Sequence, residues 1–139
     1  MIKDSVIQLF LRNILLDGLE SNSLNIPVLF ENTAKDNLKG LYIVEQLEPI
    51  EEWAYNDDVE GGEGLYKLTV FSDVGDGLSF TDAVDSIKDI FKRGEYIVDE
   101  QQNISLCIDN LITSTSLYEK NPDKVQRSVS IEYRKFRNS

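Results

Sequence analysis

Between residues 64 and 97 the hydrophobic positions first alternate and then recur at helical spacing. The segment GLYKLTVFS (64–72) places apolar side chains on both faces of an extended chain, which predicts a central strand of a sheet. DVGDGL (73–78) predicts a turn. A helix is then expected from Ser79, with an apolar face formed by Phe80, Ala83, Ile87, Ile90 and Phe91. Gly94 is expected to end this helix in the left-handed conformation.

A second amphipathic segment covers residues 4–20, and Asp4 is its expected N-cap. Its apolar positions at helical spacing are Val6, Leu9, Phe10, Ile14, Leu16 and Leu19. Leu11 and Leu15 widen this face beyond what one packing surface needs. The helix is therefore expected either to be buried on two sides or to contact a neighbouring subunit.

Shorter alternating runs predict further strands, at IPVLFEN (26–32), LYIVEQLEPIEEW (41–53) and VQRSVSIEYRKF (125–136). EYIVDEQQN (95–103) predicts a short strand and a turn, and ISLCIDNLITSTSLYE (104–119) one strand and the start of another segment. Pro49 is expected to end regular pairing or to place its strand at an edge. AYNDDVEGGEG (54–64) predicts a mobile loop, because glycines and acids dominate it. The order of elements predicts one α+β domain over residues 1–139. It contains a mixed or antiparallel sheet of about four to six strands with two main helices packed on it.

Charge is distributed unevenly along the chain, which has a net charge of −11 over 139 residues. Residues 40–66 contain eight acids and no base, whereas residues 120–139 contain six bases and two acids. Two interpretations remain open: two solvated faces, or contact between copies through an acidic face and a basic face. The candidate interface or channel-facing acids are Glu51, Glu52, Asp57, Asp58, Glu60 and Glu63. The candidate bases for a subunit or partner interface are Arg93, Lys124, Arg127, Arg134, Lys135 and Arg137. For Arg93, the dipole of the preceding helix is an equally good explanation.

Candidate chemistry is sparse. The chain has no histidine, which excludes Ser-His-Asp and Cys-His catalysis and the commonest zinc ligand. Phosphate-binding glycine motifs are missing, and Asp73 and Asp76 lack the spacing of a calcium loop. Cys107 is expected to be a small buried hydrophobe, and Trp53 either a core residue or an interface anchor. We therefore expect no enzymatic activity, no metal and no cofactor.

Composition also limits the partners. The negative net charge disfavours tight binding to nucleic-acid phosphates. Charges interrupt the apolar N-terminal segment, so neither a membrane span nor a signal peptide is expected. A single cysteine excludes an intrachain disulfide and fits a reducing cytosol.

Taken in order, these segments resemble the tail terminator (minor tail) proteins of long-tailed bacteriophages, of the lambda and related types. IPVLFEN (26–32) is similar to that family's Pro-Val-aromatic segment. Residues 64–97 resemble its strand, small-residue turn and helix ending in F-x-R-G, and residues 125–136 its closing strand. The residues that support the resemblance most are Gly64, Tyr66, Phe91, Arg93, Gly94, Ser130 and Tyr133. The acidic 45–63 segment departs from the family, which leaves the partners less certain than the fold.

The resemblance implies a structural role in the virion, at the tail or neck, with assembly in the host cytoplasm. Such proteins form a homo-oligomeric ring, commonly a hexamer, that caps the tail tube and stops its polymerisation. The ring contacts the tail tube protein on one side and head-completion or connector proteins on the other, and DNA passes through without specific binding. An acidic loop facing that channel would repel phosphates. The alternatives are a head-completion or head–tail joining protein, a small hydrolase using the 45–63 carboxylates, and an unrelated cytosolic interaction domain.

Overall fold

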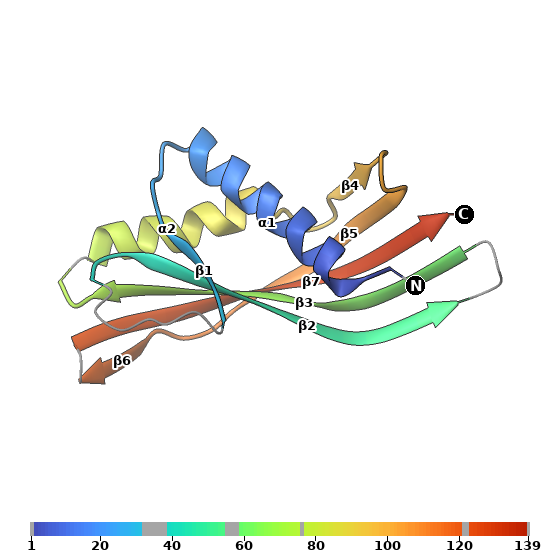
Figure 1. The fold of residues 1–139 in the computed structure, drawn as a ribbon. Helices are drawn as coiled ribbons and strands as arrows, with labels where there is room; N and C mark the ends of the chain where they lie inside the picture. Colours follow the sequence, from blue (N-terminus) through green and yellow to red (C-terminus); the bar gives the residue numbers. More distant parts are fainter. Residues whose placement is uncertain (1, 32–38, 55–58, 76, 121–122, 139) are drawn as a thin grey trace.

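The computed structural model describes residues 2–31, 39–54, 59–75, 77–120 and 123–138, and forms a seven-stranded mixed sheet with two helices on one face (Figure 1). The elements are α1 (Asp4–Ser21), β1 (Val28–Phe30), β2 (Tyr42–Ala54), β3 (Val59–Asp73), α2 (Gly77–Ile90), β4 (Tyr96–Asp99), β5 (Ile104–Thr113), β6 (Leu117–Lys120) and β7 (Asp123–Asn138). The strand order is β1-β2-β3-β7-β5-β4, and β6 pairs with the start of β7. Only β1 and β2 pair in parallel among the described strands, so the predicted α+β class is confirmed.

The core lies between the helices and the sheet. Tyr66, Leu68 and Val70 of β3 point into it, as the alternation in 64–72 predicts. β3 is a central strand, because it pairs with β2 on one side and β7 on the other. The ring of Phe91, just after α2, packs edge-on against Tyr66 at 6.0 Å between centroids. No described helix is long and apolar enough to cross a membrane.

The buried face of α1 agrees in part with the expected one, since Val6, Phe10 and Ile14 pack against the core. Its buried residues are Ile7, Leu11, Leu15 and Leu19, at a spacing of four residues. Leu9 and Leu16 are instead 58% and 39% exposed. A β-carbon on Gly18 would lie 2.5 Å from Cγ1 of Ile90, so the glycine lets α1 approach α2 closely. The Asp4 prediction is also wrong, because Lys3 occupies the N-cap without a side-chain bond and Asp4 lies inside the first turn.

The loop expected over 54–64 is largely strand. β2 continues to Ala54 and β3 begins at Val59, while residues 55–58 lie outside the described part of the chain. The glycines of this segment are sites of close approach: a β-carbon on Gly64 would lie 2.5 Å from Oη of Tyr133 and 2.9 Å from the carbonyl of Glu48. The paired ends of the two strands, residues 49–54 of β2 and 60–64 of β3, therefore form an extended hairpin, which we call the hairpin arm. Figure 1 shows this arm reaching beyond the helices.

Two predicted boundaries correspond to identifiable backbone features. The β2–β3 register shifts between Pro49 and Glu51, in a part of β2 whose other edge pairs with no described strand. Pro49 therefore interrupts pairing at an edge, as expected. Gly94 has φ +82° and follows α2, which confirms the expected left-handed residue. Its N–H donates to the carbonyl of Ile108 at 2.7 Å, joining the end of α2 to β5. α2 itself begins at Gly77, two residues before Ser79.

Candidate functional site

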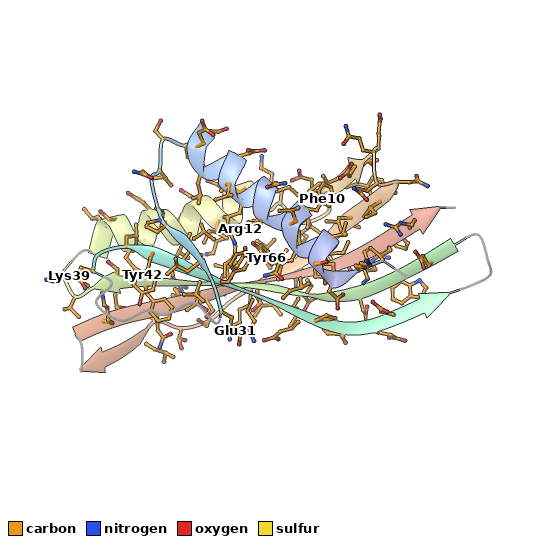
Figure 2. The ribbon with its side chains drawn as sticks, in the orientation of Figure 1. Phe10, Arg12, Glu31, Lys39, Tyr42 and Tyr66 are labelled. Atoms are coloured by element: carbon orange, nitrogen blue, oxygen red, sulfur yellow. The ribbon has the colours of Figure 1, made fainter. Side chains whose placement is uncertain are left out.

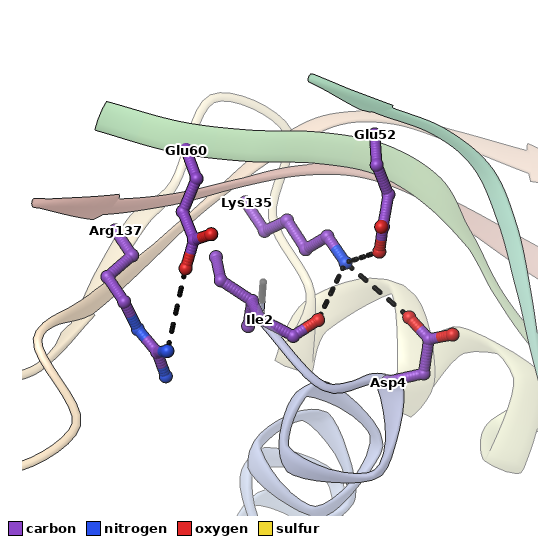
Figure 3. A network of polar contacts seen from close by, with 6 residues as sticks. All are labelled: Ile2, Asp4, Glu52, Glu60, Lys135 and Arg137. Atoms are coloured by element: carbon purple, nitrogen blue, oxygen red, sulfur yellow. Dashed lines mark hydrogen bonds and ion pairs between the residues drawn. The ribbon is translucent and has the colours of Figure 1, made fainter. Parts of the chain in front are cut away.

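The acidic and basic segments of the sequence meet inside one chain. β3 pairs with β7 so that Glu60 lies opposite Arg137 and Glu63 lies opposite Arg134. A guanidinium nitrogen of Arg137 lies 3.5 Å from a carboxylate oxygen of Glu60 (Figure 3). Part of the charge separation seen along the sequence is therefore neutralised within the same molecule. This pairing disfavours the interpretation in which the acidic segment of one copy contacts these β7 bases of another copy.

Lys135 was expected at a surface interface, and the structure corrects this. Its side chain is 2% exposed, and its ammonium donates to Glu52 at 2.9 Å and more distantly, at 3.4 Å, to the Asp4 carboxylate and to the carbonyl of Ile2 (Figure 3). Residues 129, 131, 133 and 135 share the core face of β7, so Lys135, and not Phe136, continues the inward row. The lysine joins the last described strand to the start of α1 and to the hairpin arm.

The register shift in β2 is what brings Glu52 to Lys135. Before the shift, Pro49 pairs with Gly64 on the helix-covered face, and Glu48 lies on the outer face. After it, Glu52 pairs with Gly62 on the helix-covered face, and Glu51 is turned outward. Without the extra residue, Glu52 would face away from the helices.

Lys124 is also enclosed by its own chain. Its ammonium lies 2.6 Å from an oxygen of Asp73 and 5.5 Å from the centre of the Tyr42 ring. The backbone N–H of Gly40 donates to the same carboxylate at 2.8 Å. The hydrogen bond from Lys124, followed by that from Gly40, holds the pKa of Asp73 below its ordinary value. The predicted interface role of Lys124 thus conflicts with its burial beneath neighbouring side chains.

The remaining predicted bases lie closer to solvent. Arg134 makes a two-pronged contact with Asp109 at 2.8 and 2.9 Å, which raises the pKa of the guanidinium. Arg127 donates to the carbonyl of Ser114 at 2.8 Å. Arg93 is exposed just after α2. The structure therefore disperses the six predicted bases over several surfaces and the interior.

The predicted acids divide in the same way. Glu52 and Glu60 engage bases, whereas Glu51 and Glu63 lie opposite each other on the outer face of the hairpin arm. The candidate acids Asp57 and Asp58 lie outside the described residues. The described acids consequently form no single cluster.

A buried cluster that the sequence analysis did not identify lies between α1 and the sheet. Glu45 of β2 is fully buried, and Arg12 of α1 approaches one of its oxygens to 3.0 Å. Gln8 donates to the same oxygen at 3.3 Å, and the hydroxyl of Tyr66 donates to the other oxygen. Figure 2 shows Arg12 and Tyr66 in the layer between α1 and the sheet. Burial, and then the charge of Glu45, raises the pKa of the Tyr66 hydroxyl.

Arg12 completes this cluster at the surface. Its second terminal nitrogen donates to the carbonyl of Val28 at 3.0 Å, and its guanidinium lies 4.0 Å from the centre of the Phe30 ring. One arginine thus contacts the beginning of β1, its exposed aromatic residue and the buried carboxylate. The sequence feature that could have predicted this cluster is the alternation of β2, because Glu45 shares a face with the inward-pointing Ile43.

Trp53, whose role the sequence left open, and Cys107, which was expected to be buried, both lie on the outer sheet face. Trp53 is half-buried and its ring meets Phe136 edge-on, 6.4 Å between centroids. Cys107 is half-buried opposite Arg134, with its sulfur 3.7 Å from that guanidinium and from Asp109. The expectation of a fully buried Cys107 is therefore wrong: Leu106 and Ile108 take the core positions on either side of it.

Within the part of the chain described here, no group of three or more potential ligand residues is arranged to hold a metal. The charged groups that are buried contact opposite charges, hydroxyls or backbone carbonyls from distant elements. These contacts hold elements together that are far apart in the sequence. The arrangement is thus suited to mechanical connection of α1, the hairpin arm and β7.

Comparison with known proteins adds information on fold. No protein-family model matches the chain, and no curated protein matches it. A solved structure of a protein whose name states no function is similar, with a TM-score of 0.71. The match covers 96% of this chain and 95% of that chain at 14% sequence identity. At this identity the likeness shows a shared fold across nearly the whole length of both chains.

Proposed function

We propose that this chain is a structural virion protein of a long-tailed bacteriophage, a tail terminator that forms a ring on the end of the tail tube. The resemblance of residues 26–32, 64–97 and 125–136 to that family motivates the proposal. The observation that supports it best is the one-sided architecture of the sheet, with both helices on one face and the long β2–β3 arm projecting beyond them (Figure 1). A sheet whose outer face has no helical cover offers an extended surface for assembly with other subunits.

The internal ion pairs support a mechanical role. Lys135 and Arg12 connect elements far apart in sequence, 131 residues between Asp4 and Lys135 and 33 between Arg12 and Glu45. Such links hold α1 and the arm in fixed positions relative to the sheet. A ring component that resists deformation as DNA passes requires that kind of connection.

In this proposal the ring contacts the tail tube protein on one side and connector proteins on the other. The net charge of −11 lets DNA cross without specific binding, since the protein as a whole repels phosphates.

The test is the phenotype of a phage in which this gene is interrupted. A tail terminator stops tube growth, so its loss should give tubes of uncontrolled length by electron microscopy. Heads should fill normally, and expression of the wild-type chain in trans should restore tails of one length. Tails of normal length beside unattached heads would identify a head-completion protein instead. Normal, infectious particles would contradict both roles.

A further inference from the structure

The outer face of the sheet carries a row of directly paired residues that crosses five strands at the hairpin arm. The row consists of Trp53, Gly61, Phe136, Ser105 and Val98. Directly paired residues share a face, and five strands spaced about 4.8 Å apart give a row about 19 Å long. The rings of Trp53 and Phe136 meet across Gly61, and Val98 at the far end is 51% exposed. This row, which is apolar at Trp53, Phe136 and Val98, faces away from α1 and α2.

A second row, two residues further along each strand, has an unbalanced charge. It consists of Glu51, Glu63, Arg134, Cys107 and Tyr96. Arg134 is already engaged by Asp109. Among the residues that the structure describes, Glu51 and Glu63 form no ion pair, although they face each other directly. Like charges in directly opposed positions destabilise a sheet, so a cation from another molecule beside this pair would be favourable.

Matching cations are presented at the end of α2. Lys92 and Arg93 are both exposed, and the backbone around them is held in place. The N–H of Gly94 donates to the carbonyl of Ile108 at 2.7 Å, and the N–H of Ile108 donates to the carbonyl of Glu95 at 2.9 Å. The two cations therefore project from a turn that β5 fixes.

The turn with Lys92 and Arg93 cannot contact Glu51 and Glu63 of the same chain. α2 covers one face of the sheet, and the two rows lie on the opposite face (Figure 1). The two surfaces can meet between copies. We propose that Lys92 and Arg93 of one copy dock against Glu51 and Glu63 of the next, beside the Trp53–Phe136 apolar row. Such a contact is head-to-tail, and its repetition closes into a ring when the rotation between copies allows. This inference rests on the proposed function, because it assigns the contact between ring subunits.

Charge reversal tests the contact through self-association of the intact chain, measured by sedimentation at low and high salt. Glu63→Lys and Arg93→Glu should each weaken association more than about tenfold, because each places like charges in contact. Mixing the two variants should restore association, since the reversed acidic surface of one then meets the reversed basic surface of the other. Glu51→Lys is the second acidic-side variant, because Glu51 is more exposed than Glu63. Asp17→Lys, an exposed reversal on α1, serves as a control that leaves association unchanged.

Three results would overturn the proposal. These are a wild-type chain that remains monomeric at about 1 mM and low salt, association that no single reversal weakens, and a mixture that fails to recover. If the face instead binds a different protein, the reversals leave self-association intact while abolishing incorporation into particles. The tail-length phenotype of the interrupted gene is independent of these outcomes. A wrong docking surface and a wrong function are thus distinguishable.

Discussion

The guanidinium of Arg12 on α1 lies 3.0 Å from a carboxylate oxygen of Glu45 on β2, and the Glu45 side chain is completely buried. The hydroxyl of Tyr66 donates to the other oxygen of the same carboxylate. The position of α1 is thus set by charge as well as by its apolar face. Four predictions for stability follow, from this ion pair, from the contacts of Lys135, from the buried tyrosines and from the close packing at Gly64.

Removing the positive charge of Arg12 should lower the stability of the fold. Arg12→Met leaves Glu45 buried without its counter-charge, and we expect the free energy of unfolding to fall by about 3 kcal/mol. Urea unfolding followed by circular dichroism measures the change. The double variant Arg12→Met/Glu45→Gln should recover much of the loss, because a neutral amide needs no counter-charge and its oxygen can still accept from the Tyr66 hydroxyl. A loss below about 1 kcal/mol in the single variant would mean that the pair behaves as a surface salt bridge.

The three acceptors around Lys135 should contribute unequally. Glu52→Gln is expected to lower the free energy of unfolding by about 1–3 kcal/mol, because it weakens the 2.9 Å bond to a buried ammonium. Asp4→Asn should cost less, since that oxygen is 3.4 Å away and its side chain is nearly half exposed. Glu51→Gln is the matched control, adjacent in sequence but on the other face, and should change little. Equal effects of Glu51→Gln and Glu52→Gln would contradict the register shift at Pro49.

Stability should decline at high pH through the buried tyrosines. Burial raises the pKa of both Tyr66 and Tyr133 above the ordinary value of 10.0. The protonated hydroxyls of these tyrosines therefore contribute to the free energy of unfolding. Because the folded-state pKa is raised, this contribution is fully present below pH 10 and is lost as the pH rises toward the folded-state pKa. Urea midpoints between pH 8 and pH 11 should therefore fall, and Tyr66→Phe should reduce the slope. Tyr96→Phe, at a 60% exposed position, should keep the wild-type slope; if it also flattens the decline, burial is not the cause.

Gly64 should not tolerate a β-carbon. In Gly64→Ala the new atom would lie 2.5 Å from Oη of Tyr133 and 2.9 Å from the carbonyl of Glu48. We expect a loss of about 1–3 kcal/mol from overpacking between β2, β3 and β7. Differential scanning calorimetry would detect the lowered transition temperature. An unchanged transition would show that β7 can shift away from β3 at no cost.

Local patterns predicted the elements whose partners lie nearby or whose inward residues are apolar. The alternation in 64–72 gave the correct faces of β3, and the apolar spacing of 80–91 gave the packing face of α2 with Phe80, Ala83, Ile87 and Phe91 buried. Gly94 was predictable because a left-handed residue after a helix strongly favours glycine. In these cases the local preference and the tertiary environment agree.

The predictions failed where a charge points inward or a glycine sits in a strand. Glu45 and Lys135 were interpreted as surface charges, because the cations and acids that compensate them are 33 and 83 residues away in sequence. The glycines of 61–64 resembled a loop, although they give space to Trp53, Lys135 and Tyr133. On α1 the prediction missed Ile7 and included the exposed Leu9 and Leu16, because nearly every turn offers two apolar candidates. Only the close approach at Gly18 and the ion pair of Arg12 select between them.

The position of β7 also determines when this molecule can become folded during synthesis. β7 is the last strand of the described chain, yet it lies between β3 and β5 and pairs with both. Until the residues of β7 have been synthesised, the β2–β3 arm and the β4–β5 hairpin each expose an unpaired edge. Such edges are prone to pair with other chains, so folding should be slow and late, with a high contact order. In an expressing cell, the yield of folded protein should therefore depend more on chaperone capacity and temperature than on the stability of the finished fold.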